Sequence, residues 1–168
     1  MSKLYVDEIR PKTSGKQVTF PEKPYFYIRG SQSDWRNGVG TTYTVIDDWD
    51  TSDSLYVSQG GMSYSGGKVT VPVDGLYAFN MYFGVELDNT ERAYVRIIRT
   101  RGGTDTEFSL IWDFNEGTGG QYEGTMCINQ VYKLEAGDAI SAEEYTSTTS
   151  TRILFAPTYA NFSVTFLG

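Results

Sequence analysis

Apolar residues recur at every second position over several long segments of this chain. From Tyr77 to Leu87 every second side chain is apolar, and a more polar set, including Asn80 and Glu86, fills the positions between. A period of two is typical of a strand with one buried face. The same alternation appears in Val95 and Ile97, in Phe108, Leu110, Trp112 and Phe114, in Met126 and Ile128, in Tyr132 and Leu134, and in Ala160, Phe162, Val164 and Phe166. We therefore predict at least five strands, with Trp112 among the core residues.

Glycine-rich turn signals separate these segments. They are Gly60-Gly61, Gly66-Gly67, Asp74-Gly75, Gly102-Gly103, Gly119-Gly120 and Gly137-Asp138. Their spacing is typical of a β-sandwich, not of alternating strands and helices, and no segment has a convincing helical pattern. The predicted fold class is all-β.

The composition narrows the function. At 168 residues the chain can bury a core without disulfides or metals, and its one cysteine, Cys127, cannot form an intramolecular disulfide. We expect Cys127 to be a small packed side chain. No histidine is present to act as a general base, and a net charge of −7 disfavours nucleic-acid binding. No apolar run is long enough to cross a bilayer, so we expect synthesis in the cytoplasm without membrane insertion.

The first 24 residues differ from the rest. They carry a net charge of +2, which leaves −9 on residues 25–168, and Pro11, Pro21 and Pro24 interrupt them. We interpret residues 1–24 as an extended arm and residues 25–168 as a head domain. Docking of the arm would use its apolar side chains, which are Leu4, Tyr5, Val6 and Ile9. The alternative is that Val18–Phe20 forms the first strand of the head itself.

The segment GKVTVPVDGLYAFNMYF, residues 67–83, resembles the signature of the C1q and tumour necrosis factor superfamily, in which a G-x-Y-x-F strand follows a short turn. Here that motif is Gly75, Tyr77 and Phe79. Further similarities to the family's strands and turns lie in Tyr43–Asp48, Ala93–Arg99, Val131–Ile140 and Phe162–Gly168. The resemblance spans about residues 25 to 168.

This resemblance implies a jelly-roll β-sandwich of about ten strands in two antiparallel sheets, associating as a homotrimer through an aromatic-rich sheet. The aromatic residues that it places in the core or the trimer interface are Tyr77, Phe79, Phe162 and Phe166. The leader KLYVDEIRPKTSGKQVTF is similar to the opening of virion proteins from marine tailed bacteriophages, including cyanophage-like ones. Together the two resemblances imply a virion protein with a C1q-like head.

Two groups of residues are candidate binding sites. Asp47, Asp48, Asp50 and Asp53 could hold calcium, although their spacing is not that of an EF-hand and a solvated acidic loop is the favoured interpretation. Trp35 and Trp49 lie in glycine- or aspartate-rich surroundings and are candidates for a surface contact. Glu143 and Glu144 are adjacent on a strand and would point to opposite faces, so they cannot form a glycosidase pair.

We therefore predict a phage virion structural protein, as a fibre tip, knob or capsid decoration, that is not an enzyme and needs no cofactor. Its partners would be two further copies of itself, other virion proteins of the capsid or tail, and a glycan or protein of the host surface. The alternative is a non-viral C1q-like module that binds carbohydrate or protein. A glycan hydrolase is disfavoured because no carboxylate pair has a suitable spacing.

Overall fold

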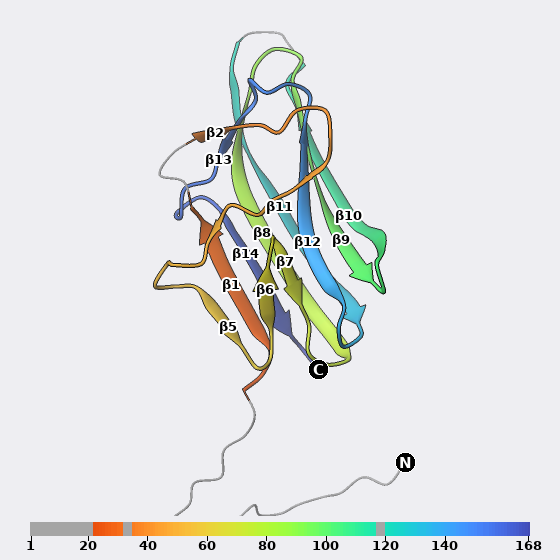
Figure 1. Ribbon diagram of the computed structural model, residues 1–168. Helices are drawn as coiled ribbons and strands as arrows, with labels where there is room; N and C mark the ends of the chain where they lie inside the picture. Colours follow the sequence, from red (N-terminus) through yellow and green to blue (C-terminus); the bar gives the residue numbers. More distant parts are fainter. Residues whose placement is uncertain (1–21, 32–34, 117–119) are drawn as a thin grey trace, which may run out of the picture.

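The computed structural model describes residues 22–31, 35–116 and 120–168. These residues form fourteen strands and no helix, so the all-β prediction is confirmed (Figure 1). The longer strands are β1 (Tyr25–Gly30), β8 (Gly75–Leu87), β9 (Arg92–Arg101), β10 (Thr104–Phe114), β11 (Tyr122–Leu134), β12 (Ala139–Thr146) and β14 (Asn161–Phe166). The short ones are β2 (Trp35–Asn37), β3 (Thr44–Val45), β4 (Trp49–Asp50), β5 (Val57–Gln59), β6 (Ser63–Ser65), β7 (Lys68–Thr70) and β13 (Arg152–Leu154).

The strands form two antiparallel sheets that lie as two layers (Figure 1). The large sheet has the order β2-β13-β8-β14-β1-β4, with β11 pairing along the whole of β8 and β5 pairing with β1. The small sheet has the order β10-β9-β12-β7-β6, with β3 pairing with β12. Most neighbouring strands, such as β8 and β14 or β9 and β12, are far apart in sequence, which is typical of a jelly roll.

The core lies between the two layers and follows the predicted alternation. Tyr77, Phe79, Met81 and Phe83 of β8 are all at most 2% exposed, and Phe162 and Val164 of β14 are fully buried beside them. Full burial of one such side chain contributes roughly 1.5 to 3 kcal/mol to stability, so this row is a substantial part of what holds the sandwich together.

In the second half of β10, the buried and exposed positions are the reverse of those that we predicted. Leu110 is 45% exposed and Trp112 is 60% exposed, while Ile111 packs against the core. The cause is an irregularity at Phe108, where the register with β9 shifts between Glu107 and Ser109. A bulge of one residue exchanges the two faces of the strand beyond it. Trp112 is therefore a surface residue.

The turn between β11 and β12 is built around Asp138. This buried carboxylate accepts hydrogen bonds from the backbone N–H of Glu135 and from Arg101 Nε and an Nη, at 2.9, 2.6 and 2.6 Å respectively. Gly137 has φ +89°, a left-handed conformation that favours glycine. These two features account for the Gly137-Asp138 turn signal in the sequence.

Gly75 of the G-x-Y-x-F motif is needed for space. Its backbone is nearly extended, but a Cβ there would overlap the Phe166 ring and lie 2.8 Å from Gly168 O. Tyr77 is fully buried, and its hydroxyl donates to Val73 O at 2.9 Å. The C-terminal end of the head therefore packs against the start of β8.

The arm residues Leu4, Tyr5, Val6 and Ile9, and the alternative strand Val18–Phe20, lie outside the described residues. The described chain begins at Glu22, and Pro24 O accepts a hydrogen bond from Phe166 N at 3.0 Å. The entry into β1 thus lies at the same end of the sandwich as the C-terminus (Figure 1).

Candidate functional site

The outward face of the large sheet carries a broad band without unpaired charge. In register across β11, β8, β14 and β1, the band consists of Val131, Ala78, Thr165 and Tyr25, then Asn129, Asn80, Ser163 and Tyr27, then Cys127, Tyr82, Asn161 and Arg29. The guanidinium of Arg29 pairs with Asp53. We call this set the neutral face. In a chain with 21% charged residues, such a face has the low charge content that is typical of the centre of an interface.

Cys127 belongs to this neutral face. We expected it to be packed, but its side chain is exposed, and its Sγ accepts a hydrogen bond from the Asn129 amide at 3.0 Å. The reason is register: Cys127 pairs with Tyr82, which is on the outward side of β8, while its neighbours Met126 and Ile128 point into the core.

A shallow hollow of about 320 Å³ adjoins the neutral face beside Tyr82. Its lining includes Trp35, Tyr82, Leu154 and Tyr159, of which Tyr159 is 56% exposed. Trp35, the first of the two predicted contact tryptophans, is half-buried there, and the guanidinium of Arg152 lies 5.4 Å from its ring centre.

Trp49, the second of the two predicted contact tryptophans, is not on the surface. It is 5% exposed, its ring centre lies 4.6 Å from that of Phe155, and its Nε1 donates to Ile46 O at 2.9 Å. This corrects our prediction of a surface contact. Trp49 and Asp50 form β4, which pairs with β1, and adjacent residues of a strand face opposite sides, so that the indole lies in the core while Asp50 is half-buried.

The candidate calcium ligands are used separately. Asp48 lies 3.0 Å from Arg36 Nε, Asp53 pairs with Arg29, and Asp50 accepts the hydroxyl of Ser52 at 2.6 Å. In the part of the chain that the structure describes, no three Asp, Glu, His or Cys side chains are grouped so that they could hold a metal ion. The fold therefore uses Asp48, Asp50 and Asp53 to fasten the loop around β4, and Asp47 is exposed.

The aromatic residues Tyr77, Phe79 and Phe162 are in the core, with Tyr77 and Phe162 fully buried, and Phe166 packs against it. The resemblance left them in the core or the trimer interface. At this depth Tyr77, Phe79 and Phe162 belong to the core, whereas Phe166 is half-buried.

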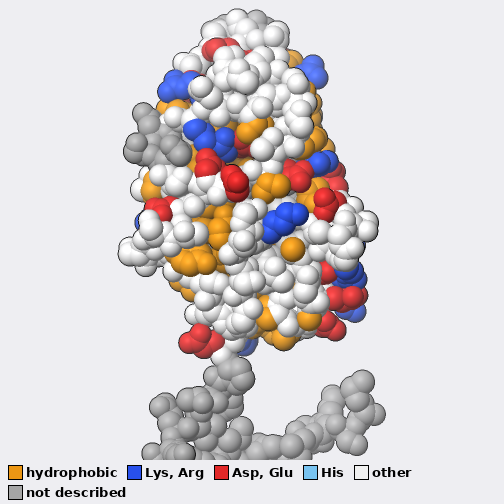
Figure 2. Space-filling model, in the orientation of Figure 1, with side chains coloured by type: hydrophobic (Ala, Val, Ile, Leu, Met, Phe, Trp, Pro, Cys, Tyr) orange, Lys and Arg blue, Asp and Glu red, His pale blue; other side chains and the backbone are white. Residues whose placement is uncertain are grey.

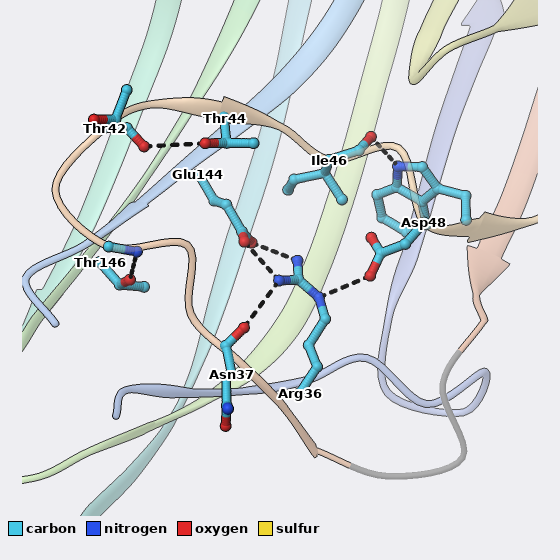
Figure 3. A network of polar contacts seen from close by, with 10 residues as sticks. Arg36, Asn37, Thr42, Thr44, Ile46, Asp48, Glu144 and Thr146 are labelled. Atoms are coloured by element: carbon cyan, nitrogen blue, oxygen red, sulfur yellow. Dashed lines mark hydrogen bonds and ion pairs between the residues drawn. The ribbon is translucent and has the colours of Figure 1, made fainter. Parts of the chain in front are cut away.

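A buried ion pair joins the two layers (Figure 3). Arg36 of β2 donates to both carboxylate oxygens of Glu144 of β12, at 2.6 Å each. Burial raises the pKa of Glu144, and the hydrogen bonds and charge of Arg36 offset only part of that effect. Burial also acts to lower the pKa of Arg36, but hydrogen bonds to Glu144 and the charges of Glu144 and Asp48 outweigh it, so that this pKa is raised.

Glu143 points outward and pairs with Arg96 at 2.7 Å, so the expectation that Glu143 and Glu144 face opposite ways is confirmed. A third buried carboxylate, Glu91, was not predicted. It accepts hydrogen bonds from the hydroxyls of Thr148, Ser150 and Thr151. Burial raises its pKa, but these bonds and one from the Asp88 backbone together hold it below its usual value. Each of these carboxylates thus has a structural partner.

On the face seen in Figure 2, acidic and basic side chains lie beside one another, with smaller hydrophobic areas between them. The arrangement is not the basic stripe that a phosphate backbone requires. Within residues 22–31, 35–116 and 120–168, no helix is long and apolar enough to cross a membrane.

Comparison with solved structures identifies the fold. The structure of Eiger TNF from S. frugiperda matches with a TM-score of 0.69, over 89% of this chain and 94% of that chain, at 16% sequence identity. The chain has a TNF-like jelly-roll fold. No protein-family model and no curated protein matches the sequence. The likeness is therefore one of fold, and it agrees with the resemblance seen in the Gly75–Phe79 motif.

Proposed function

We propose that this TNF-like jelly roll is a non-enzymatic structural module that assembles as a homotrimer through the neutral face of its large sheet. The observation that supports this proposal most directly is the composition of the neutral face. It spans four strands, presents Tyr25, Tyr27 and Tyr82 among small polar side chains, and has its one cation neutralised by Asp53. Tyrosine-rich patches with few charges are characteristic of the buried centres of interfaces.

The rim of the face supports the same proposal. Leu76 of β8 is 46% exposed and Val131 of β11 is 53% exposed, and the two lie on adjacent strands at one end of the neutral face. Three copies related by rotation close a ring and cover this apolar surface without leaving a free copy of the interface. The C1q and TNF resemblance implies that same number of subunits.

The experiment places one charge in the face. Ser163→Arg puts a cation between Asn80 and Tyr27, where an interface would leave it buried and unpaired, and should convert the trimer to a monomer. Thr104→Arg, on an exposed position at the start of β10 in the other sheet, is the matched control. Light scattering with size-exclusion chromatography reports the mass, and thermal unfolding reports the fold. A folded Ser163→Arg variant with the mass of the wild type would reject the neutral face as the interface.

The finer proposal is that the module is part of a phage particle, as a fibre tip, knob or capsid decoration, made in the host cytoplasm and docked by residues 1–24. It rests on the resemblance of the leader to virion proteins. Because Pro24 bonds to Phe166, the informative truncation removes residues 1–21 only. The truncated head should fold, by circular dichroism, yet fail to enter assembling particles. Incorporation at the wild-type level would show that docking lies elsewhere.

The alternative is a non-viral module that binds carbohydrate or protein. It shares the trimeric head, so the mass measurement does not separate the two. Detection of the chain in purified particles, by mass spectrometry and by density in an image reconstruction, favours the virion protein. Its absence from particles that are otherwise complete favours the alternative.

A further inference from the structure

A row of four aromatic rings crosses the outward face of the small sheet, opposite the neutral face. Trp112 of β10 is in register with Tyr94 of β9, and Tyr94 is in register with Tyr145 of β12. The fourth ring is that of Tyr43, the residue that precedes β3. The ring centres are 6.5, 5.3 and 5.5 Å apart along the row. We call these four residues the aromatic row. None of them is buried, and Trp112 is 60% exposed.

Two hollows lie on this row and share two residues. One, of about 330 Å³, is lined by Tyr43, Thr90, Arg92, Tyr94, Tyr145 and Ser147. The other, of about 370 Å³, is lined by Arg92, Tyr94, Leu110, Trp112 and Phe114. Each has a volume in the range of small-ligand sites. Because Arg92 and Tyr94 belong to both, one elongated ligand could occupy the two hollows together.

The two arginines of this face differ in their charge balance. Arg96 is neutralised, since Glu143 lies 2.7 Å and Glu107 3.4 Å from its guanidinium. Arg92 lies over the Phe114 ring, 4.7 Å from its centre, and pairs with no carboxylate among the described residues. A ligand that fills both hollows therefore meets one available cation at its middle. That cation favours a carboxylate, with which it can form two parallel hydrogen bonds.

The rim of the first hollow is held in place by the backbone. Thr90 is the only residue other than glycine with a positive φ, +67°, in the described part of the chain, and its N–H donates to Asn115 O at 3.0 Å. Such conformations persist where the surroundings impose them and are common at ligand sites. Ser147, which also lines this hollow, accepts a hydrogen bond from the backbone N–H of Arg92 at its hydroxyl oxygen, at 2.9 Å. Both lining segments are thus fixed before a ligand arrives.

We propose that the aromatic row and Arg92 form a binding site for a glycan that carries carboxylate groups, such as a chain containing uronic or sialic acid. The apolar faces of its sugar rings stack on Trp112 and Tyr94, and a carboxylate binds Arg92. The row is a narrow stripe because the ion pairs of Arg96 border it on one side, which suits a linear chain better than the broad patch of a protein interface. The site lies on the sheet opposite the neutral face, so it is independent of the proposed assembly.

The experiment titrates the full chain with three probes, which are tetragalacturonate, a hyaluronan tetrasaccharide and sialyllactose, and follows binding by calorimetry and tryptophan fluorescence. At least one probe should bind. Trp112→Ala should weaken the binding of that probe at least tenfold. Arg92→Gln should also weaken the binding of the acid at least tenfold, but should leave the weaker binding of the probe's methyl ester unchanged. Tyr159→Ala, which removes a similarly exposed ring from the turn between β13 and β14, is the matched control and should bind as the wild type does.

Three results would overturn the proposal. They are no binding of any of the three probes at millimolar concentration, equal affinity for an acid and its methyl ester, and binding that survives Trp112→Ala in a protein that unfolds at the wild-type temperature. Saturable binding of a protein partner that depends on Trp112, with no glycan binding, would assign the face to a protein interface. Because the trimer is measured separately, a failure here leaves the assembly proposal intact.

Discussion

At the scale of single residues, Asp138 combines a buried charge with a turn. Hydrogen bonds from Arg101 hold the pKa of its carboxyl below the usual value and outweigh the opposing effect of burial. A group whose pKa is lower in the folded protein contributes stability above its unfolded pKa, about 3.9 for Asp, and loses that contribution as the pH falls through the folded pKa.

We therefore expect Asp138→Asn to lower the melting temperature at neutral pH and to do so less and less below about pH 4. The measurement is thermal unfolding of the variant and the wild type from neutral to acidic pH. Asp105→Asn, at an exposed position, is the control and should show a small difference at every pH. A wild-type advantage that stays constant down to the lowest pH would contradict the role assigned to the ionised carboxylate.

The two tryptophans Trp49 and Trp112 give a matched pair. Trp49→Ala leaves a cavity against Phe155 and should lower the free energy of unfolding by about 3 to 5 kcal/mol, whereas Trp112→Ala should change it by about 0.5 kcal/mol or less. Denaturant titrations of both variants provide the comparison. Equal losses for the two would mean that β10 is in the register that simple alternation predicts.

At the scale of elements, the ion pair of Arg36 with Glu144 connects β2 of the large sheet to β12 of the small sheet. Removing one partner strands the other charge in the core, so Arg36→Met should cost about 3 to 5 kcal/mol. The double variant Arg36→Met with Glu144→Met removes both charges and should recover much of that loss. Urea unfolding of the two variants tests this. A double variant less stable than the single one would contradict the account.

The strands themselves follow from the sequence where the period of two is long. β8, β9, β14 and the turn at Gly137-Asp138 agree with the predicted segments, since one buried face determines the register of a strand. The expected strand over Tyr43–Asp48 is reduced to Thr44–Val45. β10 could not be predicted correctly because a one-residue bulge leaves no mark in the alternation, although it decides which side of the strand faces water.

The site depends on pairings that the sequence does not contain. Arg36 meets Glu144 across 108 residues, and the neutral face is visible only once β11, β8, β14 and β1 are aligned. On each strand by itself, these residues are mostly the polar positions expected of an ordinary solvent-facing side. The aromatic row has the same character, because Tyr43, Tyr94, Trp112 and Tyr145 come from four separate strands or their ends.

At the scale of the whole molecule, Cys127 reports on the assembly. It lies on the neutral face and is exposed in the single chain. If three copies bring these faces together, mild oxidation should link two of the three thiols and leave the third free, since a disulfide joins two chains only. Non-reducing gels should then show a covalent dimer and a monomer, and Cys127→Ser should show monomer alone. A dimer that forms only at high protein concentration would indicate random collision.

The central claim is that the neutral face is covered by two further copies of the chain, and the native mass tests it most directly. Sedimentation equilibrium of the wild-type protein at micromolar concentration should give three times the 18.8 kDa of the chain. The account requires one species at that mass over a tenfold dilution, since a stable trimer stays associated well above its dissociation constant. A single species of 18.8 kDa would contradict it.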